Sequence, residues 1–457
     1  MRRKLKYAAA AAAGVLLLLW LFCLPRDLFE GTTYSTVVTD RNGALLGARV
    51  ADDGQWRFPP CDTFPEKFVK ALVEFEDRTF FDHCGVSPRA LVRAAIQNIR
   101  NGRIVSGGST LTMQVIRLSR QKPRTLWQKL VETCMATRLE LRCSKEEILR
   151  LYAAHAPFGG NVVGIDAARW RYLGSDRTEL SWAEAATLAV LQNAPSSIHL
   201  ARNRDQLLAK RNRLLARLHA KGEIDEEDYA LALEEPLIGE PYPMPQYAPH
   251  LVEWYDRKAH GQRTVTHIDR GLQHRMEEVL VRWNRELRQK GIRDLAAIIV
   301  EVESGEPAAY CGNSDLSFDR DGKWVDIARS PRSSGSILKP LLYAAALEQG
   351  TILPNSLLPD VPMDFGGFAP KNFDGSYAGA IEADQALALS LNIPNVYLLK
   401  EYGILRFVET LRQAGLKTLS RPADEYGLSL ILGGAEVTLA DIAACYARMA
   451  ACYRDST

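Results

Sequence analysis

Five prolines lie between Pro236 and Pro249, and they divide the chain in two. Proline lacks a backbone N–H and has a fixed φ, so neither a helix nor a central strand runs through such a segment. Helical patterns dominate from residue 63 to about residue 235, whereas strand and helix patterns alternate after the prolines. With 457 residues, the chain has the length of roughly three structural units. The sequence therefore predicts an α+β multidomain protein, mainly α before the prolines and α/β after them.

We expect four segments along the chain. They are a cytoplasmic tail with a transmembrane anchor at residues 1–33, a mainly helical domain at 34–235, a linker region at 236–290 and an α/β domain at 291–457. Residues 34–58 alternate around an Asn42-Gly43 turn signal, which predicts a hairpin. The other predicted elements near or beyond the prolines are a strand at 264–268, a helix at 271–287, and two strands at 296–302 and 306–310.

The N-terminus predicts a membrane anchor. Arg2, Arg3, Lys4 and Lys6 precede an uncharged run at residues 8–24. That run is near the minimum length for a spanning helix and also suits a signal peptide. No cleavage site of the small-x-small type is evident before Pro25. Because a cationic flank stays cytoplasmic, an uncleaved single-pass anchor with the bulk of the chain outside is favoured over a cleaved signal.

Charge and cysteine content exclude some classes of protein. Lys and Arg total 57, Asp and Glu total 55, and the formal net charge of +2 argues against a nucleic-acid binder. The eight cysteines include no CxxC pair, so structural zinc is not expected, and their disulfide pairing cannot be deduced from the sequence.

Three polar clusters follow one another in the helical half. They are an acidic, basic and aromatic run at residues 76–83, a Gly-Gly-Ser-Thr run at 107–114, and the set Arg117, Arg124, Lys129 and Glu132. A glycine-rich run lets backbone N–H groups approach an anion, and the three cations suit phosphate. Taken singly, the first cluster is more typical of a solvated helix end and the third of a basic helix face.

Together, the clusters resemble the glycosyltransferase domain of class A penicillin-binding proteins. That family has the motifs ED-R-F-x-x-H-x-G, GGST-x-T-x-Q and R-K-x-x-E in this order, and a fourth segment matches residues 145–149 and 157–161. The Pro-Phe-Gly-Gly-Asn sequence at 157–161 is most similar to the penicillin-binding protein 1C subgroup. Three positions depart from the family: Gln128 replaces its usual arginine, Arg150 a common glutamate, and Ala153-Ala154 a common Leu-Asn.

The resemblance implies a lysozyme-like fold that polymerises lipid II into β-1,4 glycan strands. Glu76 would be the general base for the acceptor hydroxyl and Glu132 the second catalytic carboxylate. The implied substrate-binding residues are Gly107, Gly108, Ser109, Thr110, Gln114, Arg117, Arg124 and Lys129, with the three cations on the diphosphate. No tightly bound cofactor is implied, although a divalent cation, Mg or Mn, is compatible with this chemistry.

A second motif set lies beyond the prolines. Ser336 and Lys339 form an S-x-x-K tetrad that opens a predicted helix ending before Gly350. On a helix, positions i and i+3 share a face, so a neutral lysine can take the serine proton. Ser390 and Asn392 follow as an S-x-N motif, and residues 427–434 resemble the sequence before the third motif of penicillin-binding transpeptidases. The resemblance implies a serine transpeptidase domain with a β-lactamase-like fold.

The third transpeptidase motif, Lys-Ser/Thr-Gly, is absent from this sequence. After Asn392 the only lysines are Lys400 and Lys417, and neither begins such a tripeptide. We therefore expect a partial transpeptidase domain, cut at its C-terminal side, that does not form a stable β-lactam adduct. Stem peptides and β-lactams would be its ligands only if the domain were complete.

The sequence thus favours a peptidoglycan glycosyltransferase anchored in the bacterial inner membrane. Its partners would be lipid II, the growing glycan strand and the membrane, with no nucleic acid. One alternative is a non-catalytic cell-wall scaffold in which both sites are vestigial. Another is a soluble serine hydrolase of the β-lactamase type, but this leaves the first 235 residues unexplained.

Overall fold

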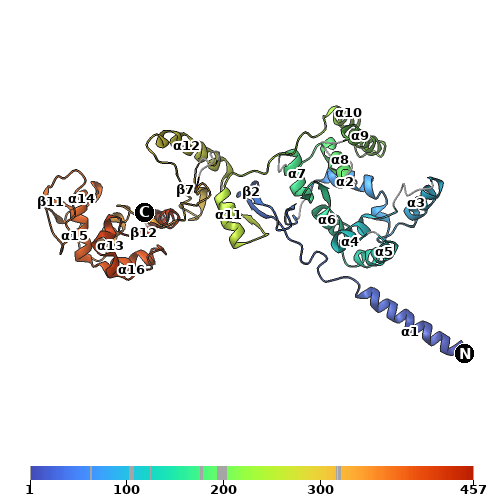
Figure 1. Cartoon of the computed structure of the whole chain (residues 1–457), viewed down its shortest axis with the longest axis horizontal. Coiled ribbons are helices and arrows are strands. Elements are labelled where there is room, and N and C mark those ends of the chain that lie inside the picture. Colours follow the sequence, from blue (N-terminus) through green and yellow to red (C-terminus); the bar gives the residue numbers. More distant parts are fainter. Residues whose placement is uncertain are drawn as a thin grey trace. The chain divides into compact units, whose positions relative to one another are not determined.

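The computed structural model describes residues 2–61, 64–101, 108–123, 125–174, 179–192, 203–314, 316 and 321–455. The chain forms two compact units (Figure 1). Unit 1 comprises Met1–Gln246 and Val252–Val265, and unit 2 comprises Tyr247–Leu251 and Thr266–Thr457. The four segment boundaries expected from the sequence stay a prediction.

Unit 1 contains a small mixed sheet in the order β2-β1-β6. Strand β1 (Thr36–Thr39) pairs antiparallel with β2 (Leu45–Arg49), which confirms the predicted hairpin. The Asp40 carboxylate closes its turn by accepting the backbone N–H groups of Asn42 and Ala44 at 2.8 Å. Strand β6 (Arg263–Val265) pairs parallel with β1, so part of the predicted linker region adds a strand to this sheet.

Helices make up most of unit 1, as predicted. After α1 they are α2 (Glu66–Glu76), α3 (Pro88–Asn101), α4 (Leu111–Arg120), α5 (Leu126–Glu140), α6 (Lys145–His155), α7 (Ile165–Leu173), α8 (Trp182–Leu191), α9 (Arg204–Ala220), α10 (Glu226–Glu234) and α11 (Pro249–Lys258), the last beginning in unit 2. Helix α8 is apolar on nearly every side, as expected of a helix at the centre of a core. Helices α2 and α9 pack against it (Figure 1).

The part of unit 1 that matters most for function is the packing of α4 against α5 and α6. Side-chain caps fix where these helices begin: Thr110 accepts the N–H of Met113, and Thr125 that of Gln128. Helix α6 begins with a complete capping box. A second small sheet, in the order β3-β5-β4, is formed by β3 (Trp56–Arg57), β4 (Pro157–Gly159) and β5 (Val162–Val163).

The N-terminal helix α1 (Arg2–Leu21) ends against α5. The indole N–H of Trp20 donates to Oγ1 of Thr137 at 3.1 Å, and the Arg138 guanidinium lies 5.8 Å from the centre of the Trp20 ring. Among the helices that the structure describes, none has both the length and the apolarity that crossing a membrane demands. The transmembrane anchor expected from the sequence is therefore not confirmed and stays a prediction.

Unit 2 begins with the elements predicted beyond the prolines. The hairpin β7 (Ala297–Val300) and β8 (Pro307–Cys311) and the long helix α12 (Arg270–Arg288) are confirmed, and α18 (Leu439–Asp455) packs on β7. The other described strands and α-helices of unit 2 are β9 (Arg332–Ser333), α13 (Lys339–Glu348), β10 (Leu357–Asp360), β11 (Gly379–Glu382), α14 (Ala383–Ala388), α15 (Asn392–Tyr402), α16 (Ile404–Gln413), α17 (Ala423–Tyr426) and β12 (Glu436–Val437). A short 3-10 helix, Leu428–Leu432, precedes β12.

A buried histidine fastens the segment after α1 to α6. The His155 ring stacks on Phe29 with ring centres 3.4 Å apart. Its Nδ1 lies 2.8 Å from the Leu151 carbonyl and its Nε2 lies 2.9 Å from the Tyr34 hydroxyl. The carbonyl can only accept, so Nδ1 carries the proton and Nε2 accepts from Tyr34. Burial lowers the pKa of His155 from 6.5 to about 4.

This pKa predicts a loss of stability in acid. The folded chain keeps His155 neutral down to about pH 4, whereas the unfolded chain protonates it near pH 6.5. The unfolded state binds more protons between these values, so the free energy of unfolding should fall by about 3 kcal/mol as the pH drops across this window. Urea unfolding of the wild type and His155→Gln from pH 7 to 4 tests this. The same pH dependence in both proteins would contradict it.

Candidate functional sites

Glu76 is the last residue of α2, and two successive hydrogen bonds from side chains of α6 and α4 hold its carboxylate. Nε2 of Gln114 donates to Oε2 of Glu76 at 2.8 Å, and the Tyr152 hydroxyl donates to Oε1 of Gln114 at 3.4 Å. Burial, reinforced by the negative charge of Glu76, raises the pKa of Tyr152 well above its ordinary value. Tyr152 therefore stays protonated and remains a donor, which fixes the Gln114 amide and through it the orientation of Glu76.

The neighbouring Asp77 joins the end of α2 to the start of α4. Its Oδ2 accepts the backbone N–H of Leu111 and Nε2–H of His83, each at 3.0 Å. The Gly85 N–H donates to Nδ1 of His83 at 3.1 Å, so the ring proton is on Nε2. The acidic pair therefore has two separate tasks: Asp77 is structural, while Glu76 is left at the surface of the site.

Gly85, the last residue of the first motif, is required by its backbone. Its φ is +85°, and a Cβ added there would lie 2.6 Å from the Ala136 carbonyl oxygen. Its own carbonyl accepts the Thr110 hydroxyl at 2.6 Å. Thr110, predicted to bind substrate, thus links the first motif to the second and caps α4.

Glu132 lies on α5, nearly buried, and forms a two-point ion pair with Arg117 of α4. Nη2 of Arg117 lies 2.8 Å from Oε2 and its Nε lies 3.2 Å from Oε1. Nη2 also donates to the Ser109 hydroxyl at 3.1 Å. Burying a carboxylate is costly unless it is paired, and here the charge of Arg117 compensates it. The pair connects two predicted catalytic and binding residues to the glycine-rich run.

A cleft of about 550 Å³ opens in front of Glu76. Ser109 lines it, as do two arginines of α3 that sequence reasoning missed, Arg89 and Arg93. These two arginines are four residues apart and so lie on one face of α3. The spacing is visible in the sequence, but a pair of basic residues on a helix is common and carries no signal by itself.

The remaining predicted binding residues are not all brought together. Gly108 packs so closely that an added Cβ would lie 3.0 Å from Cα of Leu91. Lys129 is half-buried on α5, one turn before Glu132. Gly107 and Arg124 lie outside the described residues. No group of three or more histidine, cysteine, aspartate or glutamate side chains suited to a metal is present in the described ranges. Both oxygens of Glu132 face Arg117, so we derive no step through a metal ion.

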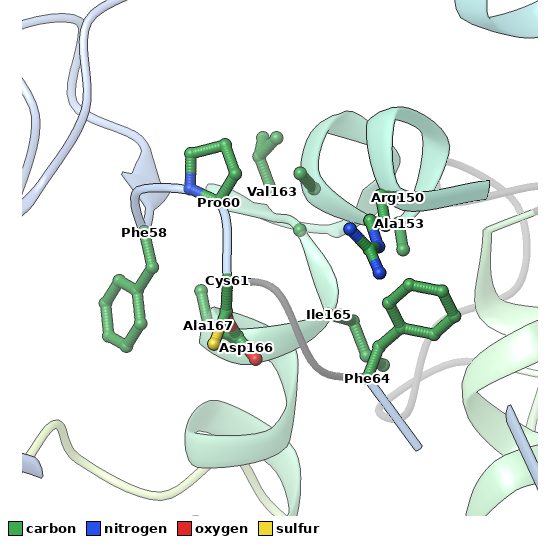
Figure 2. A pocket seen from close by; sticks show the side chains of 12 residues that line it. Phe58, Pro60, Cys61, Phe64, Arg150, Ala153, Val163, Ile165, Asp166 and Ala167 are labelled. Carbon is green, nitrogen blue, oxygen red and sulfur yellow. The ribbon is translucent and has the colours of Figure 1, made fainter. Parts of the chain in front are cut away.

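The departures Arg150, Ala153 and Ala154 lie on α6 around a different, much smaller cavity (Figure 2). Its volume is about 20 Å³, which is room for about one water molecule and not for a sugar. None of the three lines the cleft in front of Glu76. Their unusual identities therefore leave the Glu76 cleft itself unchanged.

The second site centres on Lys339 of unit 2. Its Nζ donates to the Ser390 carbonyl at 2.7 Å, to Oδ1 of Asn392 at 2.8 Å and to the Ser390 hydroxyl at 3.3 Å. Ser390 adopts a left-handed φ of +53°, which turns both of its oxygens toward the lysine. Burial lowers the pKa of Lys339 from 10.5 to about 8, so about a tenth of this amine is neutral at pH 7, far more than for an ordinary lysine.

Asn392 is held from behind by residues that sequence reasoning missed. Its backbone N–H donates to Oδ1 of Asn372 at 3.0 Å, and Nδ2 of Asn372 donates to the buried Asp360 carboxylate at 2.7 Å. Asp360 also accepts the N–H of Ala378. An asparagine in a loop between two strands gives no such signal in the sequence, because the contact is formed only when the loop folds back.

Ser336 does not lie where the sequence predicted. Helix α13 begins at Lys339, and Ser336 is exposed in the preceding turn. The reason is local. The backbone N–H of Ser334 continues the strand pairing by donating to the Ala435 carbonyl next to β12, and Gly335, with a φ of +55°, then reverses the chain. Of the described contacts of the Lys339 amine, none goes to the Ser336 hydroxyl. The end of α13 at Glu348, before Gly350, is as predicted.

Comparison with known proteins now identifies the two units. Residues 43–219 match the model of the family described as Transglycosylase, and residues 295–441 match the penicillin-binding protein transpeptidase domain. The chain is 41% identical to penicillin-binding protein 1C of Escherichia coli over 91% of this chain. It is 31% identical to penicillin-binding protein 1B of Vibrio cholerae over 88% of this chain.

The two matched domains and the similarity to penicillin-binding protein 1C fit a bifunctional class A penicillin-binding protein of the 1C type. The chain spans 54% of the length of each of these two relatives. The Glu76 cleft lies in the transglycosylase domain, and the Lys339 site lies in the region that matches the transpeptidase domain. This confirms the resemblance drawn from the motifs and the coarse prediction of a multidomain protein that mixes α and β structure, whereas the lysozyme-like and β-lactamase-like folds stay predictions.

The geometry of the transpeptidase domain predicts poor acylation by penicillin. Ser336 has no hydrogen bond to the amine that would activate it, so its hydroxyl should react slowly with a β-lactam. Fluorescent penicillin added to the full chain should therefore label well under one equivalent, with no difference between wild type and Ser336→Ala. Stoichiometric labelling that is lost in Ser336→Ala would contradict this expectation.

Proposed function

We propose that the transglycosylase domain polymerises lipid II into β-1,4 glycan strands at the Glu76 cleft. One observation carries the proposal. The Glu76 carboxylate, oriented by Gln114, lines a cleft that Ser109 also lines, and the Ser109 hydroxyl accepts a hydrogen bond from Arg117. A base beside a group of cations suits a reaction in which a hydroxyl attacks and an anionic group leaves.

Glu76 would accept the proton of the acceptor sugar's 4-hydroxyl as that oxygen attacks the anomeric carbon of the lipid-linked donor. The new glycosidic C–O bond forms while the bond from the anomeric carbon to the diphosphate breaks, and the lipid diphosphate leaves with its electron pair. Gln114 holds the carboxylate by donating to it, and Tyr152 holds Gln114. The base is thus preorganised for this step by groups that need not take part in it.

Cations rather than a general acid would stabilise the leaving diphosphate. Arg117 of α4 and Lys129 of α5 would have this role, and we add Arg124 on the resemblance alone. Glu132 would act through Arg117, because its two oxygens hold the guanidinium in a fixed orientation beside Ser109. Without Glu132 the arginine would be free to swing toward the diphosphate and to bind the ground state as well as the transition state.

The placement of the protein at a membrane belongs to the same proposal. A lipid-linked substrate requires the cleft to lie near a bilayer surface, and the cationic start and uncharged run of residues 8–24 suit an inner-membrane anchor. In the transpeptidase domain, we propose that the Lys339 site takes stem peptides as ligands. A scaffold without catalysis is the alternative, and it predicts binding of the same glycans with no new glycosidic bond.

Replacing Glu76 tests the polymerase directly. Glu76→Gln keeps the size of the side chain and can still bond to Gln114, but it removes the base, so polymerisation should fall by about 10²–10⁴-fold. Glu66→Gln, at the exposed start of the same helix, is the matched control and should leave the rate unchanged. The measurement is glycan formation from labelled lipid II, with thermal unfolding as a check on the fold. Near-normal synthesis by Glu76→Gln would refute the assignment.

A further inference from the structure

Arg120 lies one turn beyond Arg117 on α4 and, like it, reaches α5. Its Nη2 donates to Oε1 of Gln128 at 3.3 Å, and its Nη1 lies 3.5 Å from Sδ of Met135. Its Nε is buried and has no hydrogen-bond partner among the described residues. Both described contacts of the guanidinium are with neutral groups, and no described carboxylate forms an ion pair with it.

This differs sharply from Arg117, whose guanidinium is held on a carboxylate at two points. Burying a charged group beside a thioether and an amide costs free energy that these contacts do not return. A planar guanidinium that has a fixed orientation and spare donors is well suited to receive a phosphate at two points. The arrangement of Arg120 is that of an anion-binding group whose anion comes from outside the chain.

The charges on this side of α4 and α5 lead to the same conclusion. The ion pair of Arg117 and Glu132 is neutral as a whole. Arg120 and Lys129 remain, and in the described part of the chain no carboxylate forms an ion pair with either. Arg120 lies one turn after Arg117 on α4 and Lys129 one turn before Glu132 on α5, so each is on the same helix as one member of the ion pair that contacts Ser109 of the cleft. A diphosphate, which carries at least two negative charges, would compensate these two cations.

We propose that Arg120, positioned by Gln128, binds the diphosphate of the prenyl-linked substrate between α4 and α5. The inference rests on the proposed function, because it names a further residue for the same leaving group. It also gives the departure at Gln128 a role: where the family has an arginine on α5, this chain has a neutral amide that holds an arginine from α4. The cation is kept, and only the helix that supplies it differs.

Binding of farnesyl diphosphate to the full chain in detergent, measured by calorimetry, tests the proposal. Arg120→Gln should weaken binding about tenfold, since it removes one charged hydrogen-bonding group. Arg120→Lys should lose less, because the charge remains although the planar fork is lost. Arg213→Gln, at an exposed position of α9, is the matched control and should bind as the wild type does. For farnesyl monophosphate, the difference in affinity between wild type and Arg120→Gln should be smaller than for farnesyl diphosphate.

A swap of the two side chains separates binding from structure. In the double variant Arg120→Gln with Gln128→Arg, the guanidinium returns from α5 and the amide from α4, so affinity should recover to within about threefold of the wild type. A role of Arg120 in packing alone predicts no such recovery. The proposal is overturned if the wild type does not bind farnesyl diphosphate, if Arg120→Gln binds as tightly, or if the double variant remains as weak as Arg120→Gln.

These outcomes are independent of whether glycan is made. Arginine-dependent binding without polymerisation would leave the inference intact and refute the proposed function. Polymerisation by a chain whose affinity does not depend on Arg120 would do the reverse. In a polymerising chain, Arg120→Gln should also raise KM for lipid II or lower kcat without shifting the midpoint of thermal unfolding.

Discussion

The Glu76 cleft of the transglycosylase domain depends on the neighbouring carboxylate, Asp77, whose described contacts are structural. Asp77 accepts the first backbone N–H of α4 while it lies at the end of α2. A negative group is unfavourable near a helix C-terminus and favourable near an N-terminus, so the start of α4 compensates what the end of α2 disfavours. By joining the two helix ends, Asp77 places Glu76 of one helix beside Gln114 of the other. His83 and Gly85 then complete the loop that closes around this junction.

The cleft also depends on the balance of charged side chains between α4 and α5. Each helix brings charge to the shared side: arginines from α4, and Lys129 with Glu132 from α5. One buried carboxylate can compensate one arginine, so the number of carboxylates decides how many cations remain for a ligand. The proposed polymerisation would need such a surplus near its base, because the leaving diphosphate is anionic throughout the reaction. Glu132 thus orients Arg117, while Glu140, the other carboxylate of α5 that contacts α4, pairs with Lys145, so neither forms an ion pair with Arg120 or Lys129 in the described part of the chain.

The sequence predicted more of the fold than of the site's internal structure. Periodicity and turn signals located the hairpin of β1 and β2, the helix α12 and the hairpin of β7 and β8, because each depends on residues close together in the chain. The motifs selected Glu76, Glu132 and Lys339 as candidate site residues, and their catalytic roles stay predictions. The motifs could not show that the Thr110 hydroxyl donates to the Gly85 carbonyl, because that bond joins residues 25 positions apart in the chain. Tyr152 was missed for the same reason: its contact with Gln114 joins two helices 38 positions apart.

Ser336 shows where a spacing rule fails. Positions i and i+3 share a face on a regular helix, but here strand pairing extends to Ser334 and the chain reverses at Gly335. Ser336 and Lys339 are then joined by a single turn, in which the Lys339 N–H donates to the Ser336 carbonyl at 3.1 Å. The pairing partner of Ser334 is the segment around Ala435, which approaches closely because Gly433 and Gly434 have no side chains: a Cβ at Gly433 would lie 2.6 Å from the Ser333 hydroxyl oxygen. The residues that resemble the approach to the third transpeptidase motif therefore determine the conformation of the first. Lys339 contacts Ser390 and Asn392, as the motifs predicted, and these contacts do not depend on the position of Ser336.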